Sequence, residues 1–116
     1  MEATAYARFQ RYGSRKVAQV LSEIRGKTVF RAEEILPMIP RKSTVIVAKT
    51  LRSATANLQV KAGKKLDLAA IYVKAAWVGQ GPMSHMKRVL PAPQGRAMTF
   101  KRKVCHLTMV VSDERK

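Results

Sequence analysis

The side chains that most often carry catalysis or bind metals are few in this chain and lie far apart. The 116 residues include two histidines, His85 and His106, a single cysteine, Cys105, and seven acidic residues against 23 lysines and arginines. General acid–base and metal chemistry need carboxylates or histidines that converge on one site. A structural zinc site needs a full set of ligands. The sequence therefore predicts no catalytic residues, no metal site and no enzyme activity.

The remaining candidate residues have ordinary structural interpretations. The segment Gly79-Gln80-Gly81 lacks the third glycine and the following helix of a dinucleotide-binding loop, so neither a cofactor nor a small-molecule substrate is expected. Cys105 lies in an apolar, strand-like segment, which indicates a buried thiol. His106 lies on the polar face of the same segment, where we expect a hydrogen-bonded histidine of a sheet rather than a catalytic one.

Basic residues are the functional groups that this sequence has in excess. They give a formal net charge of +16, and no acid lies between Glu34 and Asp67 or between Asp67 and Asp113. Such a charge repels itself, so we expect a polyanionic partner, with nucleic acid favoured over an anionic membrane surface. The basic clusters recur along the whole chain and favour several phosphate contacts. They are Arg8, Arg11, Arg15 and Lys16; Arg25 and Lys27; Arg41 and Lys42; Lys64 and Lys65; Lys87 and Arg88; and Lys101, Arg102 and Lys103.

The aromatic residues, 6% of the chain, bear on how a nucleic acid would be recognised. Phe9, Phe30 and Trp77 fall on or near the core faces that the hydrophobic pattern predicts. Their expected burial argues against a base-stacking platform for single strands. Recognition of the shape and backbone of a folded RNA is therefore the favoured interpretation.

The helical signals predict three helices in the first half of a single domain that spans residues 1–116. Ser14 should cap a helix that Gly26 ends, and Thr28 should cap a short second helix that Pro37 ends. A longer helix is predicted over residues 41–61. No apolar run approaches the length that a transmembrane helix needs.

Alternating apolar and polar residues predict strands over residues 2–10, 68–78 and 105–111. Helices followed by antiparallel strands of this kind are typical of an α+β fold. The inward faces of the first two strands should carry Ala3, Ala5, Ala7 and Phe9, and Ile71, Val73, Ala75 and Trp77.

The segment between the second and third predicted strands holds more than half of the glycine and proline residues of the chain. A loop this long is uncommon without structure of its own. We expect residues 79–103 to form a two-stranded arm that projects roughly 30 Å. An arm without a core should be held by a partner. Its apolar residues Met83, Met86, Val89, Leu90 and Met98 could form a small folded-back cluster or an exposed surface for passing partners, and the sequence does not decide between the two.

Several segments together resemble one known family. They are SRKVAQVLSEIRGK, RSATANLQ, IYVKAAWVGQGP, MKRVLP, the Gly95-Arg96 pair and HLTMVVS, in this order along nearly the whole chain. They are similar to ribosomal large-subunit protein twenty-two of the bacterial type. The resemblance implies three helices packed on a small antiparallel three-stranded sheet, with a long protruding β-hairpin.

The resemblance also implies a function. Members of this family are structural constituents of the large ribosomal subunit that bind ribosomal RNA (rRNA) and support subunit assembly, and their hairpin lines the exit tunnel of the nascent peptide. The implied partners are rRNA, neighbouring ribosomal proteins and the nascent polypeptide, without membrane. The implied location is the ribosome in the cytoplasm, or in an organelle matrix.

The resemblance assigns two sets of residues by their positions. The hairpin tip departs from the family pattern, because Ala92-Pro93-Gln94 stands where a basic residue is usual and the approach to Lys87 is longer. The tip should therefore be less basic and differently shaped. The resemblance implies that Arg15, Lys16, Arg25 and Lys27 contact rRNA and that Lys87, Arg88 and Arg96 lie near the tunnel wall. Together with the neighbouring basic clusters, the residues expected to bind rRNA are Arg8, Arg11, Arg15, Lys16, Arg25, Lys27, Lys87, Arg88, Arg96, Lys101, Arg102 and Lys103. The implied tunnel-lining tip comprises Met86, Lys87, Arg88, Val89, Leu90, Pro91, Ala92, Pro93, Gln94, Gly95 and Arg96.

Two other classes of function compete with this interpretation. A nonspecific basic protein that binds nucleic acid or a membrane surface would share the charge, although it has no reason to build a glycine- and proline-bounded tip. A membrane binder should also show a helix with a strongly apolar face ringed by lysines. An enzyme is the third alternative.

Overall fold

The computed structural model describes residues 1–82, 87–101 and 103–113. Strands and helices follow one another as the hydrophobic pattern predicts, with short 3-10 turns (η) between them. The elements are β1 (Glu2–Gln10), α1 (Ser14–Ile24), α2 (Val29–Ile35), η1 (Leu36–Met38), α3 (Thr44–Ala62), η2 (Leu68–Ala70), β2 (Tyr72–Gln80), β3 (Lys87–Pro91), η4 (Pro93–Gly95), β4 (Ala97–Lys101) and β5 (Cys105–Ser112).

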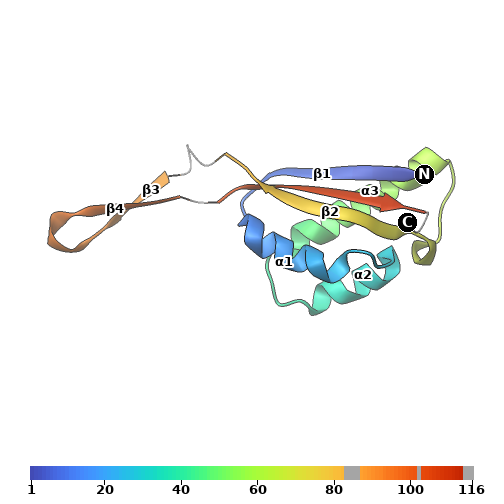
Figure 1. Cartoon of the computed structure of the whole chain (residues 1–116), viewed down its shortest axis with the longest axis horizontal. Helices are drawn as coiled ribbons and strands as arrows, with labels where there is room; N and C mark the ends of the chain where they lie inside the picture. Colours follow the sequence, from blue (N-terminus) through green and yellow to red (C-terminus); the bar gives the residue numbers. More distant parts are fainter. Residues whose placement is uncertain (83–86, 102, 114–116) are drawn as a thin grey trace.

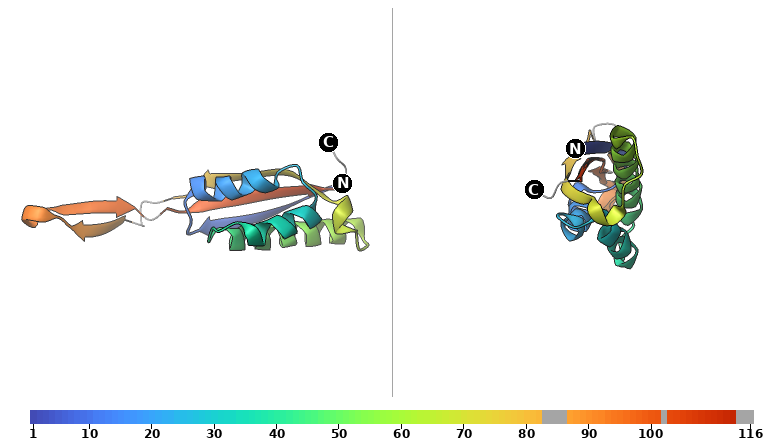
Figure 2. Two further views of the ribbon diagram at one scale, coloured as in Figure 1. Left: turned by 90° about the horizontal axis from the view of Figure 1, so that it is seen from below. Right: turned by 90° about the vertical axis from the view of Figure 1, so that its right-hand side faces the viewer.

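A three-stranded antiparallel sheet with the order β1-β5-β2 forms the centre of the globular part. Figures 1 and 2 show α1, α2 and α3 on one side of this sheet, and no helix of the described chain on the other. A single hydrophobic core lies between the two layers and includes Val17, Leu51, Leu58, Leu107 and Met109. The predicted α+β class with three helices and a hairpin is confirmed.

The helices end close to the residues predicted to stop them, but two of the three do not start as predicted. Thr28 caps α2 as expected, because its side chain accepts a hydrogen bond from the Arg31 amide. The prediction for Ser14 is wrong: Gly13 is the N-cap of α1 and provides no side-chain bond. Helix α3 begins at Thr44, after a turn that follows Pro40, rather than at residue 41. It ends at Gly63, whose φ of 73° is the left-handed conformation that favours glycine.

In β1 and β2, the side chains predicted to face the core are wrong for the residues that follow a shift in strand register. The register of β2 against β5 shifts between Val73 and Ala75, so Ala76 is buried and Trp77 is exposed. The register of β1 shifts after Ala7, and Phe9 has a φ of 57° and an exposed side chain. An extra residue reverses the side-chain alternation of a strand. Strand β2 also starts later than predicted, because residues 68–70 form η2.

The arm is a second, two-stranded sheet of β3 and β4, which pair in register from Lys87 with Lys101 to Pro91 with Ala97. It extends from one end of the globular part and gives the molecule its elongated dimensions of 64 × 26 × 20 Å (Figure 1). None of the described side chains from 89 to 100 is buried. This described part of the arm therefore has no core of its own, as the sequence predicts.

Candidate nucleic-acid interface

The basic residues of the β1–α1 turn lie at the end of the sheet from which the arm departs. Arg11, Arg15 and Lys16 are exposed. A side chain added at Gly13 in this turn would meet Cδ of Lys103 at 3.6 Å, so the start of α1 lies beside the segment that joins β4 to β5 at the base of the arm. The fold thereby brings Lys103 beside a basic cluster that lies about ninety residues earlier in the sequence.

Arg25 and Lys27 form a second basic site where α1 meets β2. The Nε of Arg25 donates a hydrogen bond of 2.7 Å to the Ala76 carbonyl oxygen. The Lys27 carbonyl oxygen accepts a bond of 2.9 Å from the Val73 amide, while its side chain is exposed. Arg25 therefore has a structural contact in addition to any contact with a partner.

Few acids neutralise these cations. The salt bridges found among the described residues join Glu2 to Lys74, Glu34 to Arg31 and Asp113 to the N-terminal ammonium group. Within this part of the chain, Arg8, Arg11, Arg15, Lys16, Lys27, Arg96 and Lys103 form no salt bridge. Their charges are therefore available to phosphate groups.

The arm carries its cations beside exposed apolar residues. In the hairpin register Lys87 lies opposite Lys101, and Arg88 lies opposite Phe100. Arg96 is exposed at the tip. Val89, Leu90 and Met98 are each more than half exposed, which argues against the folded-back cluster for these three residues.

Backbone bonds define the shape of the tip. The Ala92 amide donates to the Arg96 carbonyl oxygen at 2.8 Å, and η4 closes the turn with Gln94 and Gly95 at φ values of 62° and 71°. Two of the residues assigned from the sequence, Met86 and Arg102, lie outside the described residues, as does Met83. The structure places every other assigned residue either on the arm or on β1, α1 and the turns beside them.

The family of this chain follows from comparison with known proteins. The family model described as ribosomal protein L22p/L17e matches residues 5–112. The chain belongs to this family. It is 48% identical to the large ribosomal subunit protein uL22 of Endomicrobium trichonymphae, over 97% of this chain and 93% of that protein. It is 41% identical to uL22 of Pelotomaculum thermopropionicum, over 99% and 98%, and 37% identical to uL22 of Bdellovibrio bacteriovorus, over 98% and 100%.

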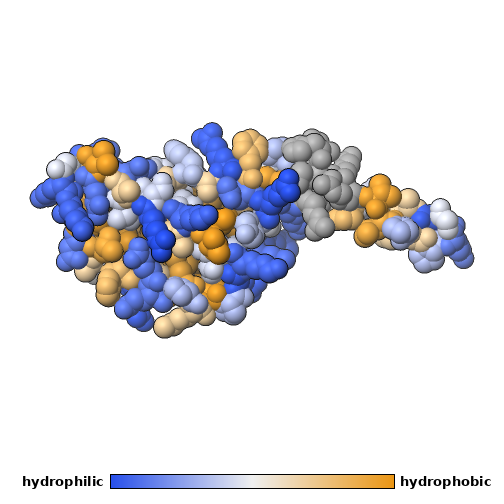
Figure 3. All heavy atoms as spheres, turned by 180° about the vertical axis from the view of Figure 1, so that it is seen from behind, coloured by the Kyte–Doolittle hydropathy of each residue, from blue (hydrophilic) through white to orange (hydrophobic). Residues whose placement is uncertain are grey.

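Membership in the L22p/L17e family confirms the resemblance that the sequence segments indicate. The match covers both the globular part and the arm, because residues 5–112 include every strand pairing of the hairpin. Figure 3 shows the molecule from behind, with hydrophilic side chains over much of the globular part and separate hydrophobic patches between them.

Cys105 and His106, the residues considered above as candidates for catalysis, have structural roles. The pKa of the Cys105 thiol is raised because burial disfavours the thiolate, and a backbone hydrogen bond at Tyr12 opposes this effect in part. Nδ1 of His106 accepts a bond of 3.0 Å from the Phe9 amide, which confirms the predicted hydrogen-bonded histidine. Among the described residues, no three histidine, cysteine or acidic side chains are grouped to hold a metal, and no helix could span a membrane.

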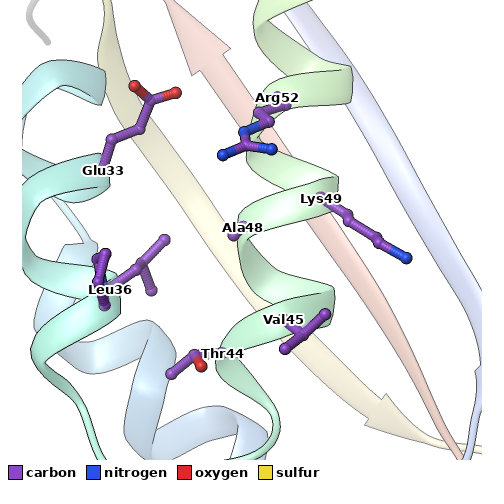
Figure 4. Close-up of a pocket in the computed structure, with 8 residues that line it drawn as sticks. Glu33, Leu36, Thr44, Val45, Ala48, Lys49 and Arg52 are labelled. Atoms are coloured by element: carbon purple, nitrogen blue, oxygen red, sulfur yellow. The ribbon is translucent and has the colours of Figure 1, made fainter.

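A groove between α2 and α3 was not predicted from the sequence. It has a volume of about 470 Å³, and its lining includes Leu36 and Ala48. Glu33 and Arg52 point toward one another across it from the two helices (Figure 4). Its lining contains no histidine or cysteine, and we assign it no chemistry.

The exposed aromatic residues were also missed by the sequence analysis. Tyr6, Phe9, Phe30 and Trp77 are all more than half exposed. The expectation that Phe9, Phe30 and Trp77 lie on core faces is therefore wrong. For Phe9 and Trp77 the cause is the register shift in each strand, a feature that strict alternation cannot reveal.

Proposed function

We propose that this chain is a structural component of the large ribosomal subunit that binds rRNA and contributes its hairpin to the wall of the nascent-peptide exit tunnel. Membership in the L22p/L17e family and the names of its relatives support the assignment to the large subunit. The observation that carries the rRNA contact is the set of unpaired cations where the β1–α1 turn meets the arm. No catalytic step is part of the proposal.

The mechanism is neutralisation of phosphate charge. Several rRNA segments repel one another when they pack closely, and exposed arginines and lysines lower that repulsion. Arg11, Arg15 and Lys16 extend from the globular part, and Lys103 lies at the base of the arm. A protein that inserts these cations between rRNA segments supports subunit assembly without reading the nucleotide sequence.

The arm is proposed to be held by rRNA and neighbouring ribosomal proteins. Its described side chains from 89 to 100 have no core to pack against, so an ordered position requires contacts from outside the chain. In the assembled subunit the tip from 86 to 96 would face the nascent polypeptide. The proposed location is accordingly the ribosome in the cytoplasm, or in an organelle matrix.

Site-specific photocrosslinking tests the tunnel position of the tip. A benzophenone amino acid in place of Arg96 should crosslink to a radiolabelled nascent chain in stalled ribosomes, because the Arg96 side chain is exposed at the tip. The same probe in place of Val60, which is exposed on α3, is the matched control and should give no nascent-chain product. Equal yields from both positions, or none from Arg96, would contradict the tunnel assignment.

A further inference from the structure

The face of the main sheet that the helices leave uncovered carries an unusual row of side chains. Tyr6 of β1 and Trp77 of β2 both lie opposite Thr108 of β5 in the strand register. The three residues therefore form one row across the sheet and project from the same face. Tyr6 is 61% exposed and Trp77 is 51% exposed, whereas Thr108 between them is almost covered.

Phe9 extends this row toward the arm. Its ring is 64% exposed and meets the His106 ring edge-on, with 4.8 Å between the centroids. The backbone of Phe9 has a φ of 57°, a conformation that costs free energy for a residue other than glycine. The bond from the Phe9 amide to Nδ1 of His106 fixes this conformation. The chain thus bears backbone strain at a residue whose ring is exposed on the surface.

The register shifts in β1 and β2 produce this face. Without the shift after Val73, the predicted alternation would turn Trp77 into the core with Ile71 and Val73. Adjacent strands are 4.7–4.9 Å apart, so the backbones at Tyr6 and Trp77 are roughly 10 Å apart across β5. Successive bases of an extended nucleic acid can stack on rings that are spread over a sheet in this way.

The charges on the same face suit an anionic partner rather than a basic or apolar protein surface, and the exposed rings beside them favour one with bases, a nucleic acid. Glu2 is the single acid in the three strands, and it pairs with Lys74. The Arg8 guanidinium lies over the Tyr6 ring, with its carbon 5.0 Å from the ring centroid. A cation over one face of a ring can contact a phosphate while a base stacks on the other face.

We propose that Tyr6, Phe9 and Trp77 form a stacking surface for unpaired bases of rRNA, with Arg8 as its phosphate contact. The proposal rests on the proposed function and adds a second mode of recognition to phosphate neutralisation. It revises the expectation that this protein recognises RNA through shape and backbone alone. It also assigns a partner to the sheet face that no helix covers.

Trp77 provides a direct readout because it is the only tryptophan of the chain. Its fluorescence in the intact protein should be quenched by a twelve-nucleotide oligoadenylate, because a stacked base quenches indole emission. Inorganic polyphosphate of matched charge is the control. It should bind the basic surface without quenching, since it has no bases. Equal quenching by both polymers, or quenching by neither, would overturn the proposal.

Substitutions separate stacking from charge. In an anisotropy assay with labelled oligoadenylate, Tyr6→Ala and Trp77→Ala should each weaken binding at least about five-fold, the lower end of the cost of losing a stacked base. The dependence of log Kd on log salt concentration should keep its slope, because no phosphate contact is lost. Trp77→Phe should retain most of the affinity. Phe30→Ala, which removes an exposed ring from α2 on the helical side of the sheet, should leave the affinity unchanged.

Sedimentation with the large subunit distinguishes failure of this proposal from failure of the proposed function. If the wild-type chain sediments with the large subunit but Tyr6→Ala and Trp77→Ala bind oligoadenylate like wild type, the stacking surface is wrong and the ribosomal role stands. If the wild-type chain does not sediment with the subunit, the proposed function fails. Thermal unfolding of each variant confirms that weaker binding does not reflect an unfolded chain.

Discussion

Arg25 shows how one basic residue can serve the fold as well as a partner. Its Nε donates to the carbonyl oxygen of Ala76, which is 51 residues away in the chain, and this bond joins the end of α1 to β2. Arg15 and Lys16, by contrast, are exposed and form no salt bridge in the described structure. The two kinds of arginine should therefore respond differently to substitution.

Arg25→Ala is expected to lower the free energy of unfolding by about 1 to 2 kcal/mol, because a hydrogen bond from a charged donor is lost. Arg15→Ala is the matched control and should change it by less than about 0.5 kcal/mol. Urea unfolding followed by circular dichroism measures both values. Equal midpoints for the two variants would show that the bond to Ala76 contributes nothing to stability.

A second prediction at the residue scale concerns Gly81, which lies where β2 leads into the arm. An added Cβ would lie 2.9 Å from Cγ1 of Val104 and 3.3 Å from its carbonyl oxygen. Gly81→Ala should therefore destabilise the protein by about 1 to 3 kcal/mol, the usual cost of overpacking.

Gly79→Ala is the control for Gly81→Ala, because nothing lies within 4 Å of its added Cβ. It should be neutral or slightly stabilising, since alanine has less freedom in the unfolded chain. Thermal unfolding in matched buffer compares the two. If Gly79→Ala were as destabilising as Gly81→Ala, the loss of stability would come from replacing glycine in the strand and not from contact with Val104.

At the scale of elements, the arm differs from the rest of the molecule. Among the described strands, β3 and β4 pair only with each other, whereas β5 is bonded on both sides. An isolated two-stranded hairpin is marginally stable in water. Stability should therefore fall sharply between the main sheet and the arm.

Amide hydrogen exchange in the free protein should report this difference. Amides of 89–100 should exchange with an opening free energy near zero, and those of α3 and β5 should exchange far more slowly, close to the rate for global unfolding. Mass spectrometry of peptides from the two regions provides the comparison. Protection of the arm equal to that of α3 would contradict the view that it needs a partner for order.

Periodicity predicted the elements well because most of them follow one regular pattern. The buried positions Val17, Val20, Leu21 and Ile24 of α1 match the helical spacing. The pattern failed where a single residue was added to a strand, so Phe9 and Trp77 were assigned to the wrong face. The sequence also could not predict which cations of the interface lie side by side, because only the folded chain brings Lys103 beside the β1–α1 turn.

At the scale of the whole molecule, shape and charge point to the same environment. A chain with a net charge of +16 and a length of 64 Å carries exposed cations on its globular part and at the tip of its arm. Self-repulsion of this charge disfavours compact structure in free solution. An RNA environment removes the repulsion and supplies contacts for the arm, so assembly and folding of the arm should be coupled.

Sedimentation of cell lysate through a sucrose gradient tests the central claim most directly. The chain should migrate with the large ribosomal subunit and remain bound after a moderate salt wash, but RNase treatment should release it. Binding through many phosphate contacts should also weaken steeply as the salt concentration rises further. Migration at the top of the gradient, or with DNA or membranes, would contradict the assignment of this basic surface to rRNA.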